Sequence, residues 1–228
     1  MYKVIILSVT ADLSQDMFDA LLPFVSDERQ KKVSRYHFNQ DAQNSLLGDI
    51  LTRIKICEAT KLSNDQLEFS ANIYGKPFLV NFPNIHYNIS HSSRYIACAL
   101  SDVPVGIDIE QLKSFNSKIA NRFFAFDEAA YIEGAQGCQK MRRFFEVWSK
   151  KESRIKWEGK GLHIPLPSFS VISHHDNKQL HYHKVFENAE AICHVCTQIS
   201  YEPSVEIIDI DGLYLLAFES NFCYSRKG

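Results

Sequence analysis

Apolar positions in the first half of the chain predict one strand, a long core helix and several further strands. Residues 3–9 are an apolar run of strand length, and Ser14 and Ser26 are typical N-cap residues for two short helices. A long helix is expected from Asn39, because apolar residues then recur every three to four positions, at Ala42, Leu46, Leu47, Ile50, Leu51, Ile54 and Cys57. Shorter segments of strand character follow at 66–70, 85–90 and 95–100.

The second half of the chain predicts the same order of elements. A strand is expected at 105–110, helices at 117–134 and 141–158, and strands near 168–173, 180–186, 191–199 and 213–218. The repeated order predicts an α+β fold of two similar subdomains packed together. The sequence has no linker rich in glycine, serine or proline, so we expect the boundary at 101–104, with an N-terminal subdomain over 1–104 and a C-terminal one over 105–228.

Composition narrows the class of protein and its compartment. The chain has 228 residues, of which 45% are hydrophobic and 23% charged, so it can bury a sizeable core. Its net charge of -2 provides no global basic field for nucleic acid or for an anionic membrane. No stretch approaches the roughly 20 apolar residues of a membrane helix, and the first apolar run is too short for a secretory signal. The six scattered cysteines are expected to be reduced, in a cytoplasmic protein.

The strand at 105–110 carries the first candidate site. Its odd-numbered residues are apolar, whereas Gly106, Asp108 and Glu110 share the opposite face. The two carboxylates stand about 6.6 Å apart at their Cα atoms, and the glycine leaves space for a ligand. Oxygen ligands at that spacing suit a hard cation such as Mg²⁺. A solvated strand face accounts for the same pattern.

A helix near residue 150 carries the second candidate site. Trp148, Glu152 and Lys156 lie at positions i, i+4 and i+8, on one face of a helix that ends at Gly159. The aromatic anchor draws this face inward, where an acid and a base need something charged between them. The alternative is a surface ion pair between Glu152 and Lys156.

Further polar groups in the first half are better suited to binding a phosphate than to forming the catalytic triad of a hydrolase. Ser90 and His91 lie where a strand ends, and Lys76 projects from a turn. Neighbouring strand residues face opposite sides and no third orienting residue is evident, which argues against a catalytic triad. A basic cluster, which a solvated helix face also explains, consists of Arg29, Lys31, Lys32 and Arg35.

A zinc site near the end of the chain is not favoured. Cys193 and Cys196 have several histidines upstream, which are the ingredients of a soft-metal site. Positions three apart on a strand face opposite sides, however, and no second cysteine pair at ligand spacing exists. We therefore expect these cysteines to be packing residues.

Four motifs, taken in order, resemble the Sfp-type 4'-phosphopantetheinyl transferases. They are Gly75-Lys-Pro77, Asn88-Ile-Ser-His-Ser92, Val105-Gly-Ile-Asp-Ile-Glu110 and the run from Trp148 to Leu162. The last motif is preceded by Arg122-Phe-Phe124, and the resemblance extends upstream to Asp41-Ala42 and Leu46-Leu-Gly48. It covers roughly residues 26–172.

The resemblance implies a fold, a reaction and a partner. The fold is a pseudo-twofold α+β monomer that holds coenzyme A in the cleft between its halves. The reaction moves the 4'-phosphopantetheine arm of coenzyme A to a serine of an apo carrier-protein domain and releases 3',5'-ADP. The carrier domain would serve fatty-acid, polyketide or nonribosomal-peptide synthesis.

The resemblance also implies which residues handle the pyrophosphate. The Mg²⁺ ligands would be Asp108, Glu110 and Glu152, and Lys151 and Lys156 would neutralise the phosphate oxygens. Glu152, directly or through a metal-bound water, would remove the proton of the attacking serine hydroxyl, and Glu128 is an alternative helper. Such charge neutralisation and proton removal are what attack on a phosphoryl group requires.

The remaining motif residues would bind coenzyme A at its adenosine end, chiefly at the 3'-phosphate. These residues are Lys32, Lys76, Pro77, Ser90 and His91. Arg29 stands where relatives often have lysine, and Ser45 where they have threonine, and both are included in the predicted coenzyme A site. Ser153 replaces an alanine that is common in the last motif.

Two other functions stay open at this point. One is a non-catalytic module that binds coenzyme A or carrier proteins, against which the complete acidic set argues. The other is a different Mg²⁺-dependent phosphotransferase, but the sequence has neither a P-loop nor a kinase-like glycine-rich loop.

Overall fold

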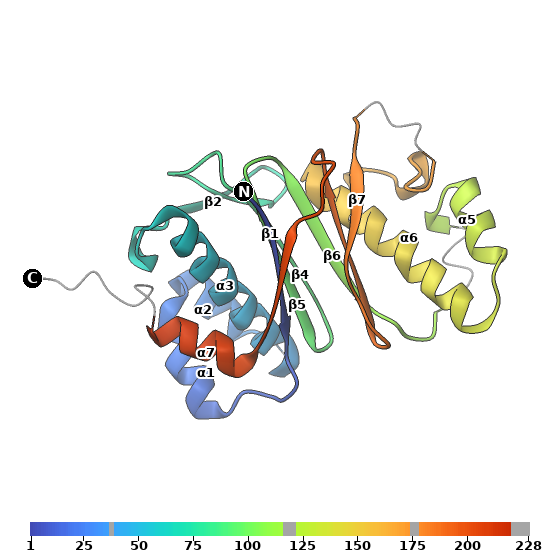
Figure 1. The fold of residues 1–228 in the computed structure, drawn as a ribbon. Coiled ribbons are helices and arrows are strands. Elements are labelled where there is room, and N and C mark those ends of the chain that lie inside the picture. The colour runs from blue at the N-terminus through green and yellow to red at the C-terminus, as the bar shows by residue number, and fades with distance from the viewer. Residues whose placement is uncertain (37–38, 116–121, 174–177, 220–228) are drawn as a thin grey trace, which may run out of the picture.

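Two sheets lie face to face at the centre of the molecule, and helices cover the outer face of each sheet (Figure 1). The computed structural model describes residues 1–36, 39–115, 122–173 and 178–219. These ranges form four layers in the order helices, sheet, sheet, helices, so the α+β class is confirmed. None of the helices in these ranges is long and apolar enough to cross a membrane.

The first sheet has four strands in the order β4-β5-β1-β9. Their bounds are His86–Ser92 (β4), Tyr95–Ser101 (β5), Tyr2–Ser8 (β1) and Ser204–Asp209 (β9). β5 pairs antiparallel with both β4 and β1. β9 comes from near the end of the chain and pairs parallel with β1, with Val205 beside Val4. The chain therefore returns to the sheet of its first half.

The second sheet has three antiparallel strands in the order β6-β8-β7. Their bounds are Val105–Gln111 (β6), Ala191–Thr197 (β8) and His181–Glu187 (β7). In each half the first strand pairs with the second strand of a later hairpin, β1 with β5 and β6 with β8. The register places Asp108 opposite His194.

Helices cover the outer faces of the two sheets. Those over the first sheet are α1 (Gln15–Leu21), α2 (Asp27–Val33), α3 (Asn39–Thr60) and α7 (Ile210–Glu219), and those over the second are α5 (Phe126–Glu133) and α6 (Gly137–Glu158). Ser14 and Ser26 cap α1 and α2 as predicted, because each side chain accepts a hydrogen bond from the backbone three residues on. The apolar residues that recur along α3 are buried from Leu46 to Cys57, as predicted.

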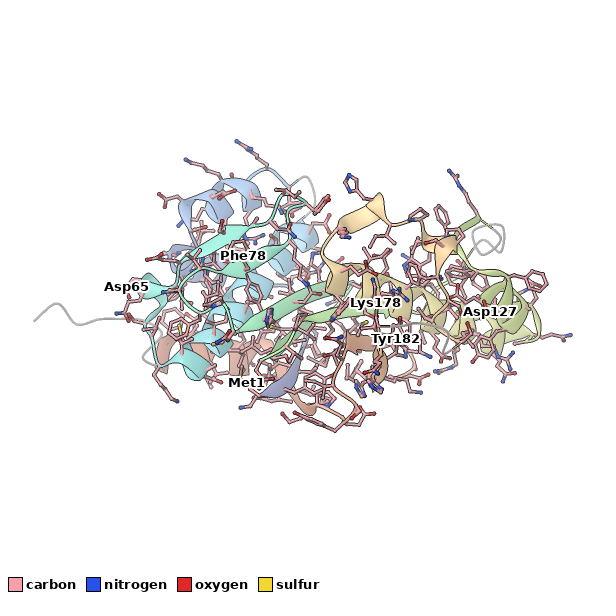
Figure 2. All side chains as sticks on the ribbon, turned by 90° about the horizontal axis from the view of Figure 1, so that it is seen from above. Met1, Asp65, Phe78, Asp127, Lys178 and Tyr182 are labelled. Carbon is pink, nitrogen blue, oxygen red and sulfur yellow. The ribbon has the colours of Figure 1, made fainter. Side chains whose placement is uncertain are left out.

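Short elements complete the fold. Single 3₁₀ turns lie at Leu22–Phe24, Asn64–Gln66, Gly161–His163 and Leu166–Ser168. The strands β2 (Phe69–Ala71) and β3 (Pro77–Leu79) form an antiparallel hairpin between α3 and β4. Figure 2 views the molecule from above and shows the strand that carries Phe78 over the first half.

Three apolar clusters hold the layers together. The first lies between the first sheet and its helices, around Leu47 and Ile50, and the third lies around Phe144 and Phe145 of α6. The second fills the space between the sheets, where Val4 and Ile6 of β1 meet the odd-numbered residues of β6. The apolar face of β6 therefore points at the first sheet, which leaves the face of Asp108 and Glu110 toward α6.

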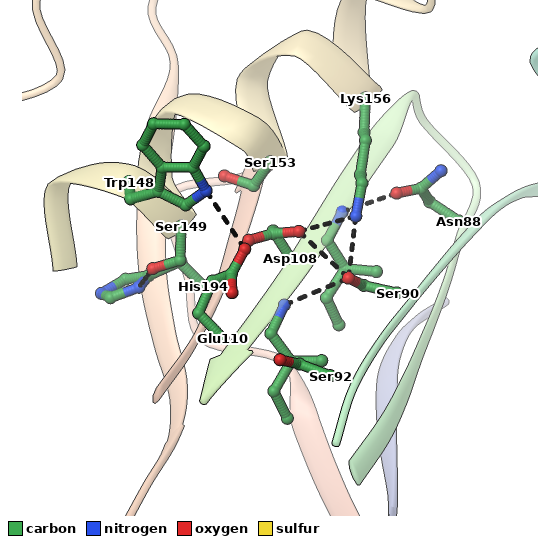
Figure 3. A network of polar contacts seen from close by, with 12 residues as sticks. Asn88, Ser90, Ser92, Asp108, Glu110, Trp148, Ser149, Ser153, Lys156 and His194 are labelled. Atoms are coloured by element: carbon green, nitrogen blue, oxygen red, sulfur yellow. Dashed lines mark hydrogen bonds and ion pairs between the residues drawn. The ribbon is translucent and has the colours of Figure 1, made fainter. Parts of the chain in front are cut away.

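A ladder of polar side chains on β4 joins the edges of the two sheets (Figure 3). The side-chain oxygens of Asn88, Ser90 and Ser92 accept hydrogen bonds from alternate backbone N–H groups of β6. The donors are the N–H groups of Ile107 at 2.8 Å, Ile109 at 3.3 Å and Gln111 at 3.0 Å. These contacts satisfy an edge of β6 that no strand of the described residues pairs with, and they fix β6 against β4.

Most predicted elements agree with the structure up to about residue 158, although the strand expected at 66–70 is observed as β2 at Phe69–Ala71 and β3 was not predicted. The predictions are wrong in parts of the last quarter. The segment 168–173 is not a strand, and 213–218 lies in helix α7 rather than in a strand. Ile210, Leu213 and Ala217 recur at helical spacing and pack into the first apolar cluster, which explains the helix. Strand β9 was not predicted. The predicted helix at 117–134 is observed as α5 over Phe126–Glu133, and 116–121 lie outside the described residues.

Candidate active site

A cavity of about 840 Å³ lies between the two halves of the molecule. Its walls come from α2, α3, β4 and the β2–β3 hairpin on one side, and from β6 and α6 on the other. The charged residues that line it include Arg29, Lys32, Asp49, Asp108, Glu110 and Lys156. A cavity of this size is sufficient for a small-molecule ligand, and both signs of charge are present on its walls.

The acidic residues of the two strongest motifs meet at one end of this cavity. Asp108 and Glu110 lie on β6 and line the cavity directly. Glu152 lies on α6 close enough for the Asp108 charge to act on it. The structure therefore places the carboxylates of 105–110 and Glu152 near one another, and their role as a ligand set stays a prediction.

Lys156 holds the centre of the polar network shown in Figure 3. Its ammonium donates to Asp108 Oδ1 at 2.7 Å and to Ser90 Oγ at 2.8 Å. Ser90 Oγ donates in turn to Asp108 Oδ1 at 3.0 Å. The other oxygen, Asp108 Oδ2, is buried and has no hydrogen-bond partner among the described residues. Glu110 Oε1 accepts from Trp148 Nε1 at 3.1 Å, so the aromatic anchor orients this carboxylate.

Burial raises the pKa values of all three carboxylates, and repulsion from the Asp108 charge adds to the rise at Glu110 and Glu152. Burial raises the pKa of Asp108, and its contacts with Lys156 and Ser90 oppose the rise. For Glu110, burial and then the Asp108 charge raise the pKa to about 7, with a further contribution from Glu152. Burial and the Asp108 charge also raise the pKa of Glu152. The cluster therefore holds more negative charge than its surroundings compensate.

The raised pKa of Glu110 predicts that the protein loses stability as pH rises. The folded state holds this proton with a pKa of about 7, against an ordinary value of 4.5. Between these values the folded state binds more protons than the unfolded chain, so the free energy of unfolding falls as pH rises through this window. In buffer with a chelator, we expect the melting temperature to fall between pH 5 and 7.5.

The Glu110→Gln variant tests whether Glu110 causes this decrease in melting temperature with pH, because it removes the titrating group. We expect the decrease in melting temperature to become smaller in Glu110→Gln and to stay unchanged in Glu68→Gln, an exposed matched control. Equal slopes in wild type and Glu110→Gln would show that the carboxylate cluster does not set the pH dependence.

Helix α6 crosses β6 at Gly106 with almost no space between the backbones. A Cβ atom at Gly106 would lie 2.0 Å from the Ser153 carbonyl oxygen and 2.3 Å from the Trp157 nitrogen. The prediction that this glycine leaves space for a ligand is therefore wrong, because the helix occupies that space. The close approach brings Glu152 and Lys156 of α6 over the carboxylates of β6. It also favours a small residue at Ser153, which is fully buried.

Basic residues of the first half line the opposite end of the cavity. Arg29 Nη1 donates to the hydroxyl of Ser45 at 3.3 Å, and its Nη2 lies 3.4 Å from Asp49 Oδ1. Partial burial lowers the pKa of His91, and the positive charges of Lys156, Lys32 and Arg29 lower it further. Positive groups on α2 and α6 thus act together on His91 of β4, as expected of an anion site.

Lys151 is not brought to this site. It follows Lys150 and precedes Glu152, and the turn of the helix directs it away from β6 and toward α5. Its ammonium lies 2.7 Å from Glu128 Oε2 and donates to the carbonyls of Leu166 and Phe169. Its side chain is 1% exposed. The expectation that Lys151 neutralises a pyrophosphate is corrected by this placement.

Glu128 is also removed from the cavity. Its side chain is fully buried, pairs with Lys151, and accepts from the backbone N–H groups of Ala125 and Val171. With all of these donors around it, Glu128 cannot reach a hydroxyl in the cavity. The structure therefore excludes it as a helper for the base and gives it a role in joining α5 to α6.

Lys76 lies at the edge of the cavity but its ammonium points elsewhere. Gly75 and Pro77 line the cavity on either side of it. Its Nζ atom donates to the backbone carbonyls of Trp157 at 3.1 Å and Val105 at 3.3 Å. Burial lowers the pKa of Lys76 to about 8. The predicted contact with a 3'-phosphate is thus not what this side chain makes.

Sequence reasoning missed the roles of Asn88 and Ser92. They support β6 rather than facing a ligand, and the signal for this was the alternation of polar residues at 88, 90 and 92 on one strand. Cys193 packs between the sheets, whereas His194 accepts or donates a hydrogen bond with Ser149 of α6 at 2.6 Å. Successive side chains of β8 therefore point to opposite faces of the sheet, as expected.

Comparison with known proteins identifies relatives along most of the chain. Residues 12–102 match the family model described as 4'-phosphopantetheinyl transferase, N-terminal, and residues 104–211 match that of the 4'-phosphopantetheinyl transferase superfamily. The chain is 43% identical to the 4'-phosphopantetheinyl transferase ffp of Bacillus subtilis, over 73% of this chain and 74% of the relative. It is 41% identical to Sfp of Bacillus subtilis strain 168 over the same shares, and 39% identical to gsp of Aneurinibacillus migulanus over 75% and 71%.

The cavity carries carboxylates on β6 and basic residues on α2 and α6. Together with these relatives, it shows that the chain belongs to the Sfp-type 4'-phosphopantetheinyl transferases. The implied reaction, transfer of the 4'-phosphopantetheine arm of coenzyme A to carrier proteins, is confirmed at the level of the family. A non-catalytic binding module is not favoured.

Proposed function

We propose that this transferase works with Mg²⁺ held by Asp108, Glu110 and Glu152, and that coenzyme A occupies the cavity between the halves. The observation that carries the proposal is that Asp108 and Glu110 of β6 line the cavity, that Glu152 of α6 lies near enough for the Asp108 charge to act on it, and that Arg29 and Lys32 line the same cavity from the first half. In this proposal the pyrophosphate of coenzyme A lies between the cation and the basic side chains of the cavity.

The residues of the cluster fit a hard cation by their chemistry. All the donors are carboxylate oxygens, which Mg²⁺ prefers, and Asp108 Oδ2 is a buried oxygen without a hydrogen-bond partner in the described structure. The raised pKa values show that the ionised carboxylates are disfavoured in this buried place, and a divalent cation would stabilise them. Among the described residues, however, no three such groups lie close enough together to form a ligand set, so the proposal rests on the donor chemistry of Asp108, Glu110 and Glu152 and not on a formed site. When bound, Mg²⁺ supplies positive charge against the pyrophosphate oxygens.

Lys156 is proposed to neutralise a phosphate oxygen during the transfer. Its ammonium reaches both Asp108 and Ser90 and lines the cavity, with 27% of its side chain exposed. A positioned ammonium beside developing negative charge stabilises the transition state more than the ground state. Ser90, fixed by β6, keeps Lys156 directed into the cavity.

Glu152 is proposed as the base that removes the proton of the attacking serine hydroxyl. Its pKa is raised by burial and by Asp108, which brings it closer to the working pH of the enzyme. Its place on α6, one turn before Lys156, puts acceptor and ammonium on the same face of the helix. A base and a charge-neutralising group then act on the same reacting phosphate.

The adenosine end of coenzyme A is proposed to lie against the first half. Arg29, Lys32 and His91 place positive or polar donors on one part of the cavity, and Ser45 and Pro77 lie beside them. Arg29, Lys32 and Ser45 lie on α2 and α3, on the other side of the cavity from the carboxylates of β6, so they contribute binding that need not change in the transition state.

We further propose a pseudo-twofold monomer in the cytoplasm, serving carrier domains of fatty-acid, polyketide or nonribosomal-peptide synthesis. The matching strand orders β4-β5-β1 and β7-β8-β6, each with a long helix on its outer face, support the pseudo-twofold. The five described cysteines are unpaired by disulfides, which supports a reducing compartment.

Mass spectrometry of a carrier domain tests the reaction and its metal requirement. The protein is incubated with coenzyme A, Mg²⁺ and an apo carrier domain, and the carrier is weighed. We expect the carrier serine to gain one phosphopantetheine group, and we expect EDTA to suppress the gain and added Mg²⁺ to restore it. Transfer at the full rate in EDTA would contradict the metal proposal, and coenzyme A binding without any transfer would revive the binding-module alternative.

A further inference from the structure

The turn that joins β2 to β3 contacts the C-terminal end of α6, although the two segments are about 80 residues apart in the chain. Asn72 Nδ2 donates to the carbonyl of Gly159 at 2.9 Å. Lys76 Nζ donates to the carbonyl of Trp157 at 3.1 Å. The last carbonyls of a helix have no partner within the helix, so two of them are satisfied here by the other half of the molecule.

The turn is built to present these two side chains. Asn72 Oδ1 accepts from the backbone N–H groups of Tyr74 and Lys76, both at 2.9 Å, and the backbone of Asn72 pairs with that of Lys76. One side chain therefore closes the turn with its oxygen and caps the helix with its nitrogen. Gly159 has φ +66°, and a Cβ atom there would lie 2.6 Å from Lys76 Cδ, so the lysine stem packs closely on the helix end.

Lys76 also reaches the first residue of β6. Its ammonium donates to the Val105 carbonyl at 3.3 Å. Because Ile107 and Ile109 direct their N–H groups toward β4, the alternation of an antiparallel strand directs the Val105 carbonyl to the same unpaired edge. One ammonium thus joins the two elements that carry the proposed reaction, β6 with Asp108 and α6 with Glu152 and Lys156. A cation at this place also complements the negative end of the helix dipole.

We propose that the Asn72–Lys76 turn is a clamp on the C-terminal end of α6, and that Lys76 is a positioning residue that acts on the transfer through α6 rather than by contact with coenzyme A. This inference rests on the proposed roles of Glu152 and Lys156. Lys156 is only one residue before the clamped carbonyl of Trp157, so loosening the helix end moves its ammonium directly. Misplacement of a reacting group by about 1 Å can cost about 100-fold in rate.

The variants Lys76→Met and Asn72→Ala test the clamp. Methionine at position 76 keeps the apolar part of the lysine side chain and removes its hydrogen-bond donors. Asn72 is exposed, so Asn72→Ala is the milder change and serves as the test if Lys76→Met does not fold. We expect kcat to fall by about 10- to 100-fold in Lys76→Met, and Lys76→Arg, which keeps charged donors, to recover most of it. The exposed Lys31→Met is the matched control, with unchanged kcat.

Two further measurements separate the clamp from a phosphate contact and from general loss of stability. Affinities for coenzyme A and for dephospho-coenzyme A, which lacks the 3'-phosphate, should decrease by the same factor in Lys76→Met, whereas His91→Ala should lose affinity for coenzyme A alone. Hydrogen exchange of the amides at 155–159 should become faster in Lys76→Met and Asn72→Ala and stay unchanged in His91→Ala.

If Lys76→Met lost affinity for coenzyme A but not for dephospho-coenzyme A, Lys76 would contact the 3'-phosphate and the proposal would be overturned. Unchanged kcat and unchanged hydrogen exchange in both Lys76→Met and Asn72→Ala would also overturn it. The two proposals fail separately. If the wild type transferred no phosphopantetheine to any carrier, the proposed function would fail, while hydrogen exchange and the ratio of the two donor affinities would still decide the clamp.

Discussion

Replacing Asp108 by asparagine is expected to abolish phosphopantetheine transfer while the protein stays folded. Asparagine has the same shape and keeps an oxygen for the contacts with Lys156 and Ser90, but it removes the charge. The cluster then loses the buried carboxylate that faces both the cavity and α6. We expect kcat to fall by about 1,000-fold or more, since loss of one preorganised electrostatic group costs about 100- to 1,000-fold and a metal ligand is lost with it.

The measurement is the initial rate of carrier modification over a series of Mg²⁺ concentrations, with circular dichroism to check folding. Asp12→Asn, on an exposed loop, is the matched control and should retain full activity. Activity of Asp108→Asn that returned to the wild-type level at saturating Mg²⁺ would show that this carboxylate only adjusts affinity for the cation. Full activity at every Mg²⁺ concentration would remove it from the site.

Gly106→Ala is expected to be the most damaging glycine-to-alanine change among the glycines that the structure describes. The added Cβ would meet backbone atoms of Ser153 and Trp157 rather than the movable end of a side chain. The helix must therefore shift or the protein must unfold. Overpacking of this kind costs about 3 kcal/mol or more, which corresponds to a loss of about 6 to 12 °C in melting temperature for a chain of this length. Activity should be lost as well, because the shift moves Glu152 and Lys156 together.

Thermal unfolding and the transfer assay on the same preparation check this result. Gly134→Ala is the matched control, because the atoms nearest to a Cβ there lie at 3.3 Å and beyond and its φ is an ordinary -67°. We expect Gly134→Ala to unfold within a few degrees of the wild type. A Gly106→Ala protein with native stability and activity would contradict the close packing of α6 on β6.

Local patterns predicted which faces of β6 and α6 carry the acidic residues of the proposed site. The alternation along 105–110 placed Asp108 and Glu110 on one face, and helical spacing placed Glu152 and Lys156 on another, because these directions follow from the backbone of a single element. The structure then brings the two faces together at Gly106. The long helix from Asn39 was predictable for the same reason, since its apolar period lies within one continuous segment.

The directions of two lysines were decided by tertiary structure. Lys151 is one position from Glu152, yet about 100° of helical rotation turns it toward Glu128 on α5. Lys76 lies in a motif that borders the cavity, yet unsatisfied carbonyls of α6 and β6 attract its ammonium. In both cases the partner comes from a segment distant in sequence, which a motif does not contain.

The sequence by itself determined the α+β class, the family and the residue types of the acid cluster, because these depend on short patterns and on motifs in order. Only the tertiary structure decided the pairing of β9 with β1 and the contact of the Asn72–Lys76 turn with α6. The physical reason is that pairing of strand edges and capping of helix ends are satisfied by whichever backbone or side-chain group arrives there in the folded chain, independent of its distance in sequence.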